Sequence, residues 1–278
     1  MQYPDYRYQL NAVRRLKRWN VIGWSLCGRG IFALQRGSGR PRVLIAAGFH
    51  GMEYLTVLTA LRYARECKCD ISVTIVPCVN PDGTEIALNG FQTAGEYACR
   101  AAKLCEDHRR WQANARGVDI NHNFPACWDQ VRQHELDLGI TGPSCTRFGG
   151  YRPESEPETR ALTGLCRAAD FDRVLALHSQ GREIYWDFEN CAPERGRELA
   201  ARMAQVSGYT VAQPEPIATG GGFKDWFLQK YRRPGFTVEM GKGKNPLPLS
   251  DFEAEYLRVR AILDTFIRAE STDLMNGE

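Results

Sequence analysis

The sequence predicts an α/β fold in which helices flank a mixed, largely parallel central sheet. Short apolar segments rich in branched residues alternate along the chain with amphipathic segments of helical length. Such alternation is typical of a sheet covered by helices. No internal repeat and no linker rich in Pro, Gly and Ser divides the 278 residues. We therefore expect one domain over residues 1–278, with its core at about residues 20–270.

Four buried strands are expected, because four short segments are apolar and rich in branched residues. They lie, in chain order, at residues 43–49, 71–76, 174–177 and 236–238. In a sheet of this type, ligands bind outside the carboxyl ends of the strands. Functional side chains are therefore expected directly after these segments.

Four helices are expected between and after these strands, at residues 53–66, 157–168, 192–206 and 251–268. Ser155 is followed three residues later by Glu158, with Pro157 in the first turn, which predicts a capping box at the start of the second helix. The stretch from about 84 to 150 has weak periodicity and many turn residues. We expect long loops there.

The composition excludes several classes of protein. Hydrophobic residues make up 43% and charged residues 25%, which is typical of a folded globular chain and excludes a low-complexity or disordered one. The chain has 36 Lys and Arg against 33 Asp and Glu, a net charge of +3. This balance gives no strong field for polyanions, so we expect neither nucleic acid nor a membrane surface as a partner.

The ten cysteines form no metal-binding or disulfide framework. Cys67 and Cys69 form a C-x-C, but no C-x-x-C pair occurs, so a cysteine zinc ribbon is not expected. The N-terminus has no apolar stretch typical of a signal peptide, and no segment approaches about 20 consecutive apolar residues. We expect reduced thiols in a cytoplasmic protein. A secreted form from which a signal peptide had been removed would have the same sequence.

A metal site is predicted at the ends of two of the expected strands. His50 and Glu53 form an H-x-x-E directly after the first strand, and His178 directly follows the third. Two His and one Glu are a known catalytic zinc set, so we expect one Zn²⁺ per chain on these residues. The alternative is that His50 caps a helix and His178 is a core imidazole. Since two of only five His close apolar strands, the metal site is favoured.

Three more residues suggest metal-assisted hydrolysis. Glu239 closes the last expected strand, where it would take a proton from the attacking water and pass it to the leaving amine. The alternative for Glu239 is an ion pair with a nearby Arg. Asp119 is expected to orient a ligand imidazole through its other nitrogen. Arg116 is expected to stabilise the developing oxyanion.

These residues together resemble the zinc carboxypeptidase family, whose best-known member is carboxypeptidase A. The resemblance covers roughly residues 40 to 245 and rests on ordered features, namely the H-x-x-E at 50–53, Gly117-Val118-Asp119-Ile120-Asn121, His178-Ser179, Asp225-Trp226 and Glu239. It implies the fold of that family, which is phosphorylase/hydrolase-like. It also implies a zinc peptidase in which Asp119 lies beside the first zinc histidine.

The sequence departs from the family where substrate specificity is set. Members carry Asn-Arg after G-V-D-x to bind the terminal carboxylate of the substrate, and this chain has Asn121-His122. A histidine does not reproduce the paired donors of a guanidinium. The position of the family's capping tyrosine corresponds to Ile217, and the base of the specificity pocket to Lys224. A lysine there favours an acidic group on the substrate, so a digestive type of carboxypeptidase is not expected.

Two stretches, residues 178–186 and 222–243, look like bacterial γ-D-glutamyl-diamino acid peptidases. These enzymes cut the bond between D-Glu and meso-diaminopimelate or Lys in peptidoglycan stem peptides. The resemblance implies a small acidic peptide (muropeptide) as partner, with its carboxylates recognised by Asn121, His122, Lys224 and Arg182. For Lys224 and Arg182, a solvated surface charge is the alternative.

Three other functions stay open on the sequence. One is a metallocarboxypeptidase of another specificity. Another is an N-acyl amino acid deacylase related to aspartoacylase, which shares the metal set. A non-catalytic binder of wall fragments would require a broken site, whereas every catalytic position is intact here. The predicted ligand set also tolerates divalent ions other than zinc.

Overall fold

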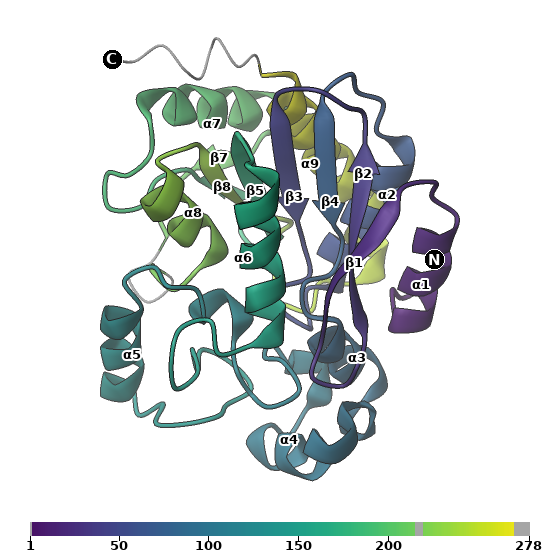
Figure 1. Ribbon diagram of the computed structural model, residues 1–278. Helices are drawn as coiled ribbons and strands as arrows, with labels where there is room; N and C mark the ends of the chain where they lie inside the picture. The colour runs from purple at the N-terminus through teal and green to yellow at the C-terminus, as the bar shows by residue number, and fades with distance from the viewer. Residues whose placement is uncertain (1, 215–218, 270–278) are drawn as a thin grey trace.

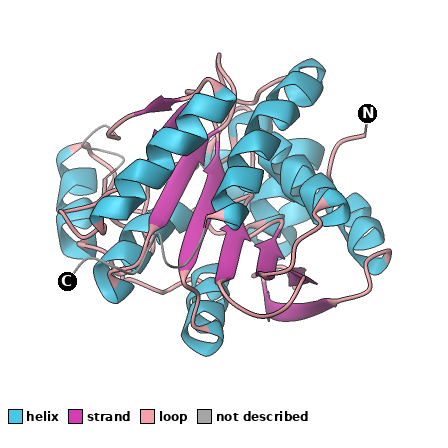
Figure 2. Ribbon diagram, turned by 90° about the horizontal axis from the view of Figure 1, so that it is seen from above, coloured by secondary structure: helices cyan, strands magenta, loops and turns pink. Residues whose placement is uncertain are grey.

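The computed structural model describes residues 2–214 and 219–269. In these residues eight strands form one mixed sheet in the order β1-β2-β4-β3-β5-β8-β6-β7 (Figures 1 and 2). The strands are β1 (Trp19–Trp24), β2 (Gly30–Arg36), β3 (Arg42–Ala46), β4 (Ser72–Val76), β5 (Arg173–His178), β6 (Glu183–Tyr185), β7 (Thr210–Val211) and β8 (Gly235–Glu239).

The four central strands β4, β3, β5 and β8 run parallel to one another. On one side of them β2 pairs antiparallel with β4, and β1 antiparallel with β2. On the other side β6 pairs antiparallel with β8 and parallel with β7. The prediction of a mixed, largely parallel sheet is therefore confirmed.

Helices cover both faces of this sheet, as the view from above shows (Figure 2). They are α1 (Tyr6–Arg14), α2 (Tyr54–Glu66), α3 (Pro81–Asn89), α4 (Ala98–Leu104), α5 (Trp128–Asp137), α6 (Pro157–Ala169), α7 (Glu194–Ser207), α8 (Phe223–Tyr231) and α9 (Phe252–Arg268). Figure 1 shows α6 in front of the sheet and α9 behind it.

Successive residues of the central strands enter two separate hydrophobic cores. Val43 and Ile45 of β3 pack with α2, α7 and α9, whereas Leu44 and Ala46 pack with α6 and α8. Because parallel strands covered on both faces bury every side chain, their sequences are apolar without interruption. This is why the four strands predicted from apolar runs are the four central ones.

All four predicted strands and all four predicted helices are confirmed, but the capping box is wrong. The N-cap of α6 is Glu156, and its side chain makes no capping hydrogen bond. Ser155 Oγ instead donates to Glu156 Oε1 at 2.6 Å and accepts from Asn123 Nδ2 at 2.9 Å. The serine is thus occupied by a long-range contact that sequence spacing does not reveal.

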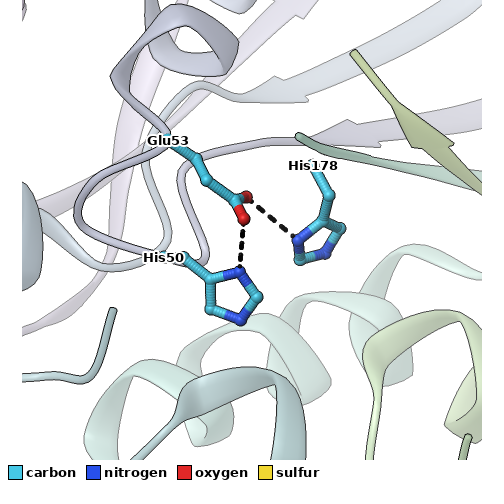
Figure 3. Close-up of side chains that lie close together, drawn as sticks. All are labelled: His50, Glu53 and His178. Atoms are coloured by element: carbon cyan, nitrogen blue, oxygen red, sulfur yellow. Dashed lines mark hydrogen bonds and ion pairs between the residues drawn. The ribbon is translucent and has the colours of Figure 1, made fainter. Parts of the chain in front are cut away.

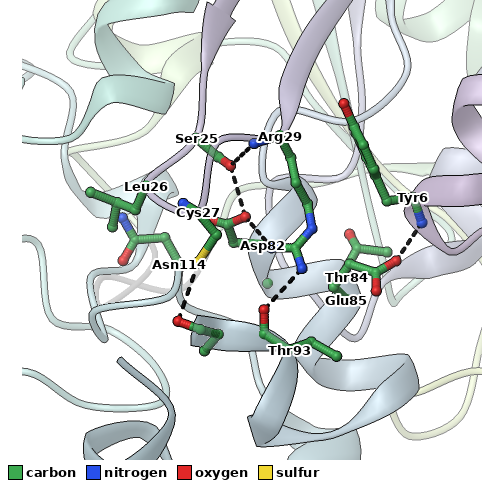
Figure 4. A network of polar contacts seen from close by, with 12 residues as sticks. Tyr6, Ser25, Leu26, Cys27, Arg29, Asp82, Thr84, Glu85, Thr93 and Asn114 are labelled. Carbon is green, nitrogen blue, oxygen red and sulfur yellow. Dashed lines mark hydrogen bonds and ion pairs between the residues drawn. The ribbon is translucent and has the colours of Figure 1, made fainter. Parts of the chain in front are cut away.

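The expectation of long loops between residues 84 and 150 is only partly right, since α4 and α5 form within this stretch. A buried polar network orders its beginning (Figure 4). Asp82 of α3 pairs with Arg29 at 2.6 Å and accepts from Ser25 Oγ and the Cys27 amide, at 2.7 and 2.9 Å. Arg29 also donates to the Thr93 carbonyl at 2.9 Å. These polar contacts connect the segment to the β1–β2 turn, and a search for helical periodicity does not detect them.

Two further features bear on the sequence predictions. All ten cysteines lie within the described residues and are unpaired there. In residues 2–214 and 219–269, no helix is both long enough and apolar enough to cross a membrane.

Candidate active site

The ends of three parallel strands bring the predicted site residues together. His178 is the last residue of β5 and lies directly opposite Glu239, the last residue of β8. His50 and Glu53 lie in the turn between β3 and α2. An added Cβ on Gly51 in this turn would lie 2.2 Å from the Gly83 carbonyl oxygen of α3. Only glycine permits so close a backbone approach, which holds the turn against α3.

His50, Glu53 and His178 form a cluster whose ligand atoms all lie within 4.8 Å of one another. Glu53 bridges the two rings, as Figure 3 shows: Oε1 lies 2.8 Å from His50 Nδ1 and Oε2 lies 3.2 Å from His178 Nδ1. Within residues 2–214 and 219–269 it is the one group of three or more His, Cys, Asp and Glu side chains arranged to hold a metal.

The cluster fits a zinc ion. Glu53 and His178 are 3% and 2% exposed. His178 Nε2 is buried without a hydrogen-bond partner among the described residues, and Glu53 Oε2 forms no hydrogen bond there, although His178 Nδ1 lies 3.2 Å from it. A buried carboxylate oxygen without a donor is costly, and a cation between the three side chains would offset this cost. Burial also lowers the pKa of His178, which favours the neutral imidazole that a metal requires.

Asp119 lies where the resemblance implies, behind His50. Its Oδ1 is 3.1 Å from His50 Nε2 and accepts from the Asn121 amide at 3.0 Å, while Oδ2 accepts from the Arg147 amide at 2.9 Å. Burial disfavours its charged form, but His50 and His122 outweigh this effect and lower the pKa of Asp119. Asp119 is thus an ionised carboxylate. It holds His50 through Nε2, so that Nδ1 of the same ring points toward Glu53.

Glu239 faces the same cavity as the metal cluster. Burial raises its pKa well above the ordinary value, and the carboxylates of Glu53 and Glu183 raise it further. No described arginine forms an ion pair with Glu239, so the alternative of a structural ion pair finds no support. A carboxyl group with a raised pKa is suited to accept and return a proton.

The cavity in front of the cluster has a volume of about 1140 Å³ and lies at the carboxyl ends of the central strands. Asn121 and His122 line it. Asn121 Oδ1 accepts from the Phe223 amide at 3.1 Å, and His122 Nδ1 lies 3.0 Å from the buried carboxylate of Glu135. Both side chains are therefore held in place by the protein.

Lys224 also lines the cavity, but its charge is already matched. Its side chain is 5% exposed and Nζ lies 2.5 Å from Asp225 Oδ1. Nζ also donates to the Asp187 carbonyl at 2.6 Å. That Lys224 forms the base of a specificity pocket stays a prediction. Its preference for an acidic group is weakened, because Asp225 neutralises the ammonium.

Two arginines expected at the substrate, Arg116 and Arg182, are not among the residues that line the cavity. Arg116 Nε donates to Glu156 Oε2 at 2.8 Å, and Arg182 Nε donates to Glu255 Oε1 at 3.0 Å. Glu156 and Glu255 are almost fully buried, so each requires a cation of its own. Ile217, where the family has its capping tyrosine, lies outside the described residues.

Sequence reasoning missed several residues that line the cavity, among them Gln112, Arg147 and Glu183. Arg147 has a φ of 65° and lies in the turn-rich stretch, where no periodicity marks it. Glu183 and Tyr185 alternate along β6 and both line the cavity. Their spacing of two is the signal that identifies one face of a short strand.

Comparison with known proteins agrees with this geometry. A family model described as zinc carboxypeptidase matches residues 11–261. Gamma-D-glutamyl-L-diamino acid endopeptidase 1 of Lysinibacillus sphaericus is 33% identical, over 92% of this chain and 70% of that protein. Murein peptide amidase A of Escherichia coli is 28% identical, over 68% of this chain and 67% of that protein. The structure of bovine thrombin-activatable fibrinolysis inhibitor with tick carboxypeptidase inhibitor has the same fold (TM-score 0.77, 19% identity, 96% of each chain).

Proposed function

Since the chain belongs to the zinc carboxypeptidase family and is a zinc metallopeptidase, we propose that it hydrolyses the amide bond between γ-D-Glu and a diamino acid. The diamino acid is meso-diaminopimelate or Lys, in a peptidoglycan stem peptide. The observation that carries this proposal is the match over 92% of the chain to a protein named for that cleavage. The cavity of about 1140 Å³ beside the metal cluster supports it, because charged side chains line it and it has room for a short peptide.

In this proposal His50, Glu53 and His178 hold one zinc ion. When bound there, zinc supplies Lewis-acid activation of the scissile carbonyl and of water. Asp119 keeps the imidazole of His50 in the required orientation through its contact with Nε2. Buried glutamates hold Arg116 and Arg182 away from the cavity, so they have no part in this mechanism.

Glu239 is the general base and then the general acid. Its raised pKa lets the carboxylate take the proton of the attacking water and keep it until the amine departs. It then gives this proton to the leaving nitrogen, so that the diamino acid leaves with a neutral or protonated amine. The C–N bond breaks, and the γ-carboxylate of D-Glu gains one oxygen from water.

Asn121 and His122 are proposed to bind the carboxylates of the substrate. Both line the cavity and both are oriented by contacts with the protein, Asn121 with the Phe223 amide and His122 with Glu135. Lys224 Nζ donates to the Asp187 carbonyl and forms an ion pair with Asp225. Since an ammonium has three donors, an N–H of Lys224 remains for a substrate oxygen.

The test is incubation of the zinc-loaded protein with L-Ala-γ-D-Glu-meso-diaminopimelate, with the same peptide carrying L-Lys, and with N-acyl amino acids. We expect free diamino acid from one or both peptides. Cleavage of N-acetyl-aspartate alone would contradict the proposal and would favour a deacylase. Release of C-terminal residues from ordinary peptides at equal rates would favour a carboxypeptidase of another specificity.

A further inference from the structure

Glu183 is a carboxylate of the cavity that has no cation within ion-pair distance among the described residues. Two other charged groups of the cavity wall, Lys224 and Arg109, are paired with Asp225 and Asp107. Glu183 forms no ion pair in residues 2–214 and 219–269. It nevertheless lines the same cavity as the metal cluster.

The position of Glu183 is fixed by strand pairing. It lies directly opposite Glu239 in the antiparallel β6–β8 ladder, and Tyr185 lies opposite Thr237 two residues further along. The Tyr185 hydroxyl donates to Glu183 Oε2 at 2.7 Å. An added Cβ on Gly181 would lie 3.4 Å from the same oxygen, so the backbone there passes close to the carboxylate. The protein thus holds Glu183 at a defined point of the cavity wall.

Two carboxylates on facing residues of neighbouring strands repel each other. The role of Glu239 in proton transfer explains why one of these two carboxylates is present. The charge of Glu183 has no such role in the mechanism, and its partner within the described residues is a neutral hydroxyl. A cationic group of a ligand bound at this wall would form an ion pair with Glu183.

The chemistry of the site indicates which part of the substrate meets Glu183. Glu239 protonates the departing amine, so the leaving amino acid lies against the end of β8 during the reaction. Glu183 and Tyr185 of β6 flank that strand end. The side chain of the leaving amino acid therefore passes along the β6–β8 wall, with Lys224 of α8 at the same cavity.

We propose that Glu183 is the specificity-determining residue that binds the side-chain ammonium of the leaving diamino acid. This inference rests on the proposed function, and it defines the substrate class as peptides whose leaving residue carries a side-chain ammonium. Both Lys and meso-diaminopimelate satisfy this requirement. Tyr185 orients the carboxylate, and Glu239 remains the group that handles the proton.

The test compares L-Ala-γ-D-Glu-L-Lys with L-Ala-γ-D-Glu-L-norleucine, which has the same four-carbon side chain without the amino group. The measured quantity is the ratio of kcat/KM for the two peptides. We expect the wild-type protein to prefer the Lys peptide by ten-fold or more, and Glu183→Gln to reduce this ratio to within about three-fold of unity. The norleucine peptide serves as the internal control for folding and for the metal site in the variant.

Glu194→Gln is the matched control, because Glu194 is an exposed glutamate at the start of α7 whose side chain is 74% exposed. It changes the charge by the same amount and should leave the ratio at its wild-type value. The proposal is wrong if Glu183→Gln keeps the wild-type ratio, or if the wild-type protein does not distinguish the two peptides.

A second pair of substrates separates this inference from the proposed function. N-acyl-Ala-L-Lys and N-acyl-Ala-L-norleucine present the same leaving residues without a γ-D-Glu bond. If only this pair is cleaved, the proposed function is wrong. The role of Glu183 is then still tested, by the preference for Lys in the wild-type protein and its loss in Glu183→Gln. If both pairs are cleaved without a Lys preference, the role of Glu183 fails and the proposed function stands.

Discussion

At the scale of single residues, two carboxylates around the cluster have different tasks because their surroundings differ. Asp119 receives a backbone amide on each oxygen and lies beside His50, which keeps it ionised. The Glu239 carboxylate receives no hydrogen bond from the described residues, and burial together with two other carboxylates raises its pKa. The first arrangement is suited to orienting a ligand and the second to moving a proton.

Glu239→Gln is expected to lower kcat by roughly 10²-fold to 10⁴-fold, because the amide neither accepts nor returns the proton. The variant should bind one zinc per chain like the wild-type protein, since Glu239 is not in the metal cluster. Steady-state kinetics together with elemental analysis of the same sample check this. Near-normal turnover would show that another group is the base.

Asp119→Ala is expected to weaken zinc binding by about 10-fold to 100-fold, since it removes the carboxylate that orients His50. Titration against a competing chelator measures this affinity. Asp119→Asn provides the comparison: it keeps an acceptor for the Arg147 amide and should lose less affinity. Equal affinity in Asp119→Ala and the wild-type protein would rule out the orienting role.

At the scale of secondary-structure elements, ion pairs between buried glutamates and arginines join segments far apart in the chain. Arg182, just before β6, pairs with Glu255 of α9, and Tyr209 also donates to Glu255 at 3.1 Å. Arg116 pairs in the same way with Glu156 at the start of α6. These arginines therefore position elements, although their place in the sequence suggests a role at the substrate.

Arg182→Met is expected to destabilise the protein by about 1–3 kcal/mol, because it leaves Glu255 buried without its cation. The catalytic constants should stay near those of the wild-type protein at a temperature where the variant is folded. Urea denaturation and steady-state kinetics give the two values. A large fall in kcat/KM at unchanged stability would show instead that Arg182 acts on the substrate.

The start of α6 carries a pH-dependent contribution to stability. Burial raises the pKa of Glu158 to about 8 from an ordinary value of 4.5, with Asp82 and Glu156 adding to the shift. The folded protein therefore holds a proton that the unfolded chain releases between these two values. The free energy of unfolding should fall as the pH rises through this window, by about 1.4 kcal/mol for each unit of pKa shift at most.

Glu158→Gln should remove this dependence, since the amide has no proton to lose and retains an acceptor for the Asn114 amide. The measurement is the urea midpoint at pH 5, 7 and 9 for both proteins. We expect the variant to gain in relative stability toward pH 9. Parallel curves for the two proteins would contradict the raised pKa.

The predictions from sequence succeeded for elements with a simple apolar pattern and failed for others. β3, β4, β5 and β8 are buried on both faces, so composition alone identifies them. β6 and β7 have three and two residues, too few for a pattern. The metal cluster was predictable because its residues close such strands. The ion-pair partners of Arg116 and Arg182 were not predictable, because ion pairs between distant segments have no characteristic spacing in the sequence.

At the scale of the whole molecule, the sheet brings residues from distant parts of the chain to one edge. The turn after β3 carries His50 and Glu53, β5 ends at His178, and β8 ends at Glu239. The strand ends, the segment before α5 and the start of α8 line a cavity of about 1140 Å³ at this edge. The net charge of +3 is small, so charges inside the cavity, and not the overall field, select the substrate.

The central claim is that the zinc-loaded protein cuts between γ-D-Glu and the diamino acid with water as nucleophile. Its most direct test is mass spectrometry of the products of L-Ala-γ-D-Glu-meso-diaminopimelate hydrolysed in H₂¹⁸O. We predict that L-Ala-D-Glu gains one ¹⁸O and that free meso-diaminopimelate gains none. Label in any other fragment, or products cut at the L-Ala–D-Glu bond, would contradict the claim.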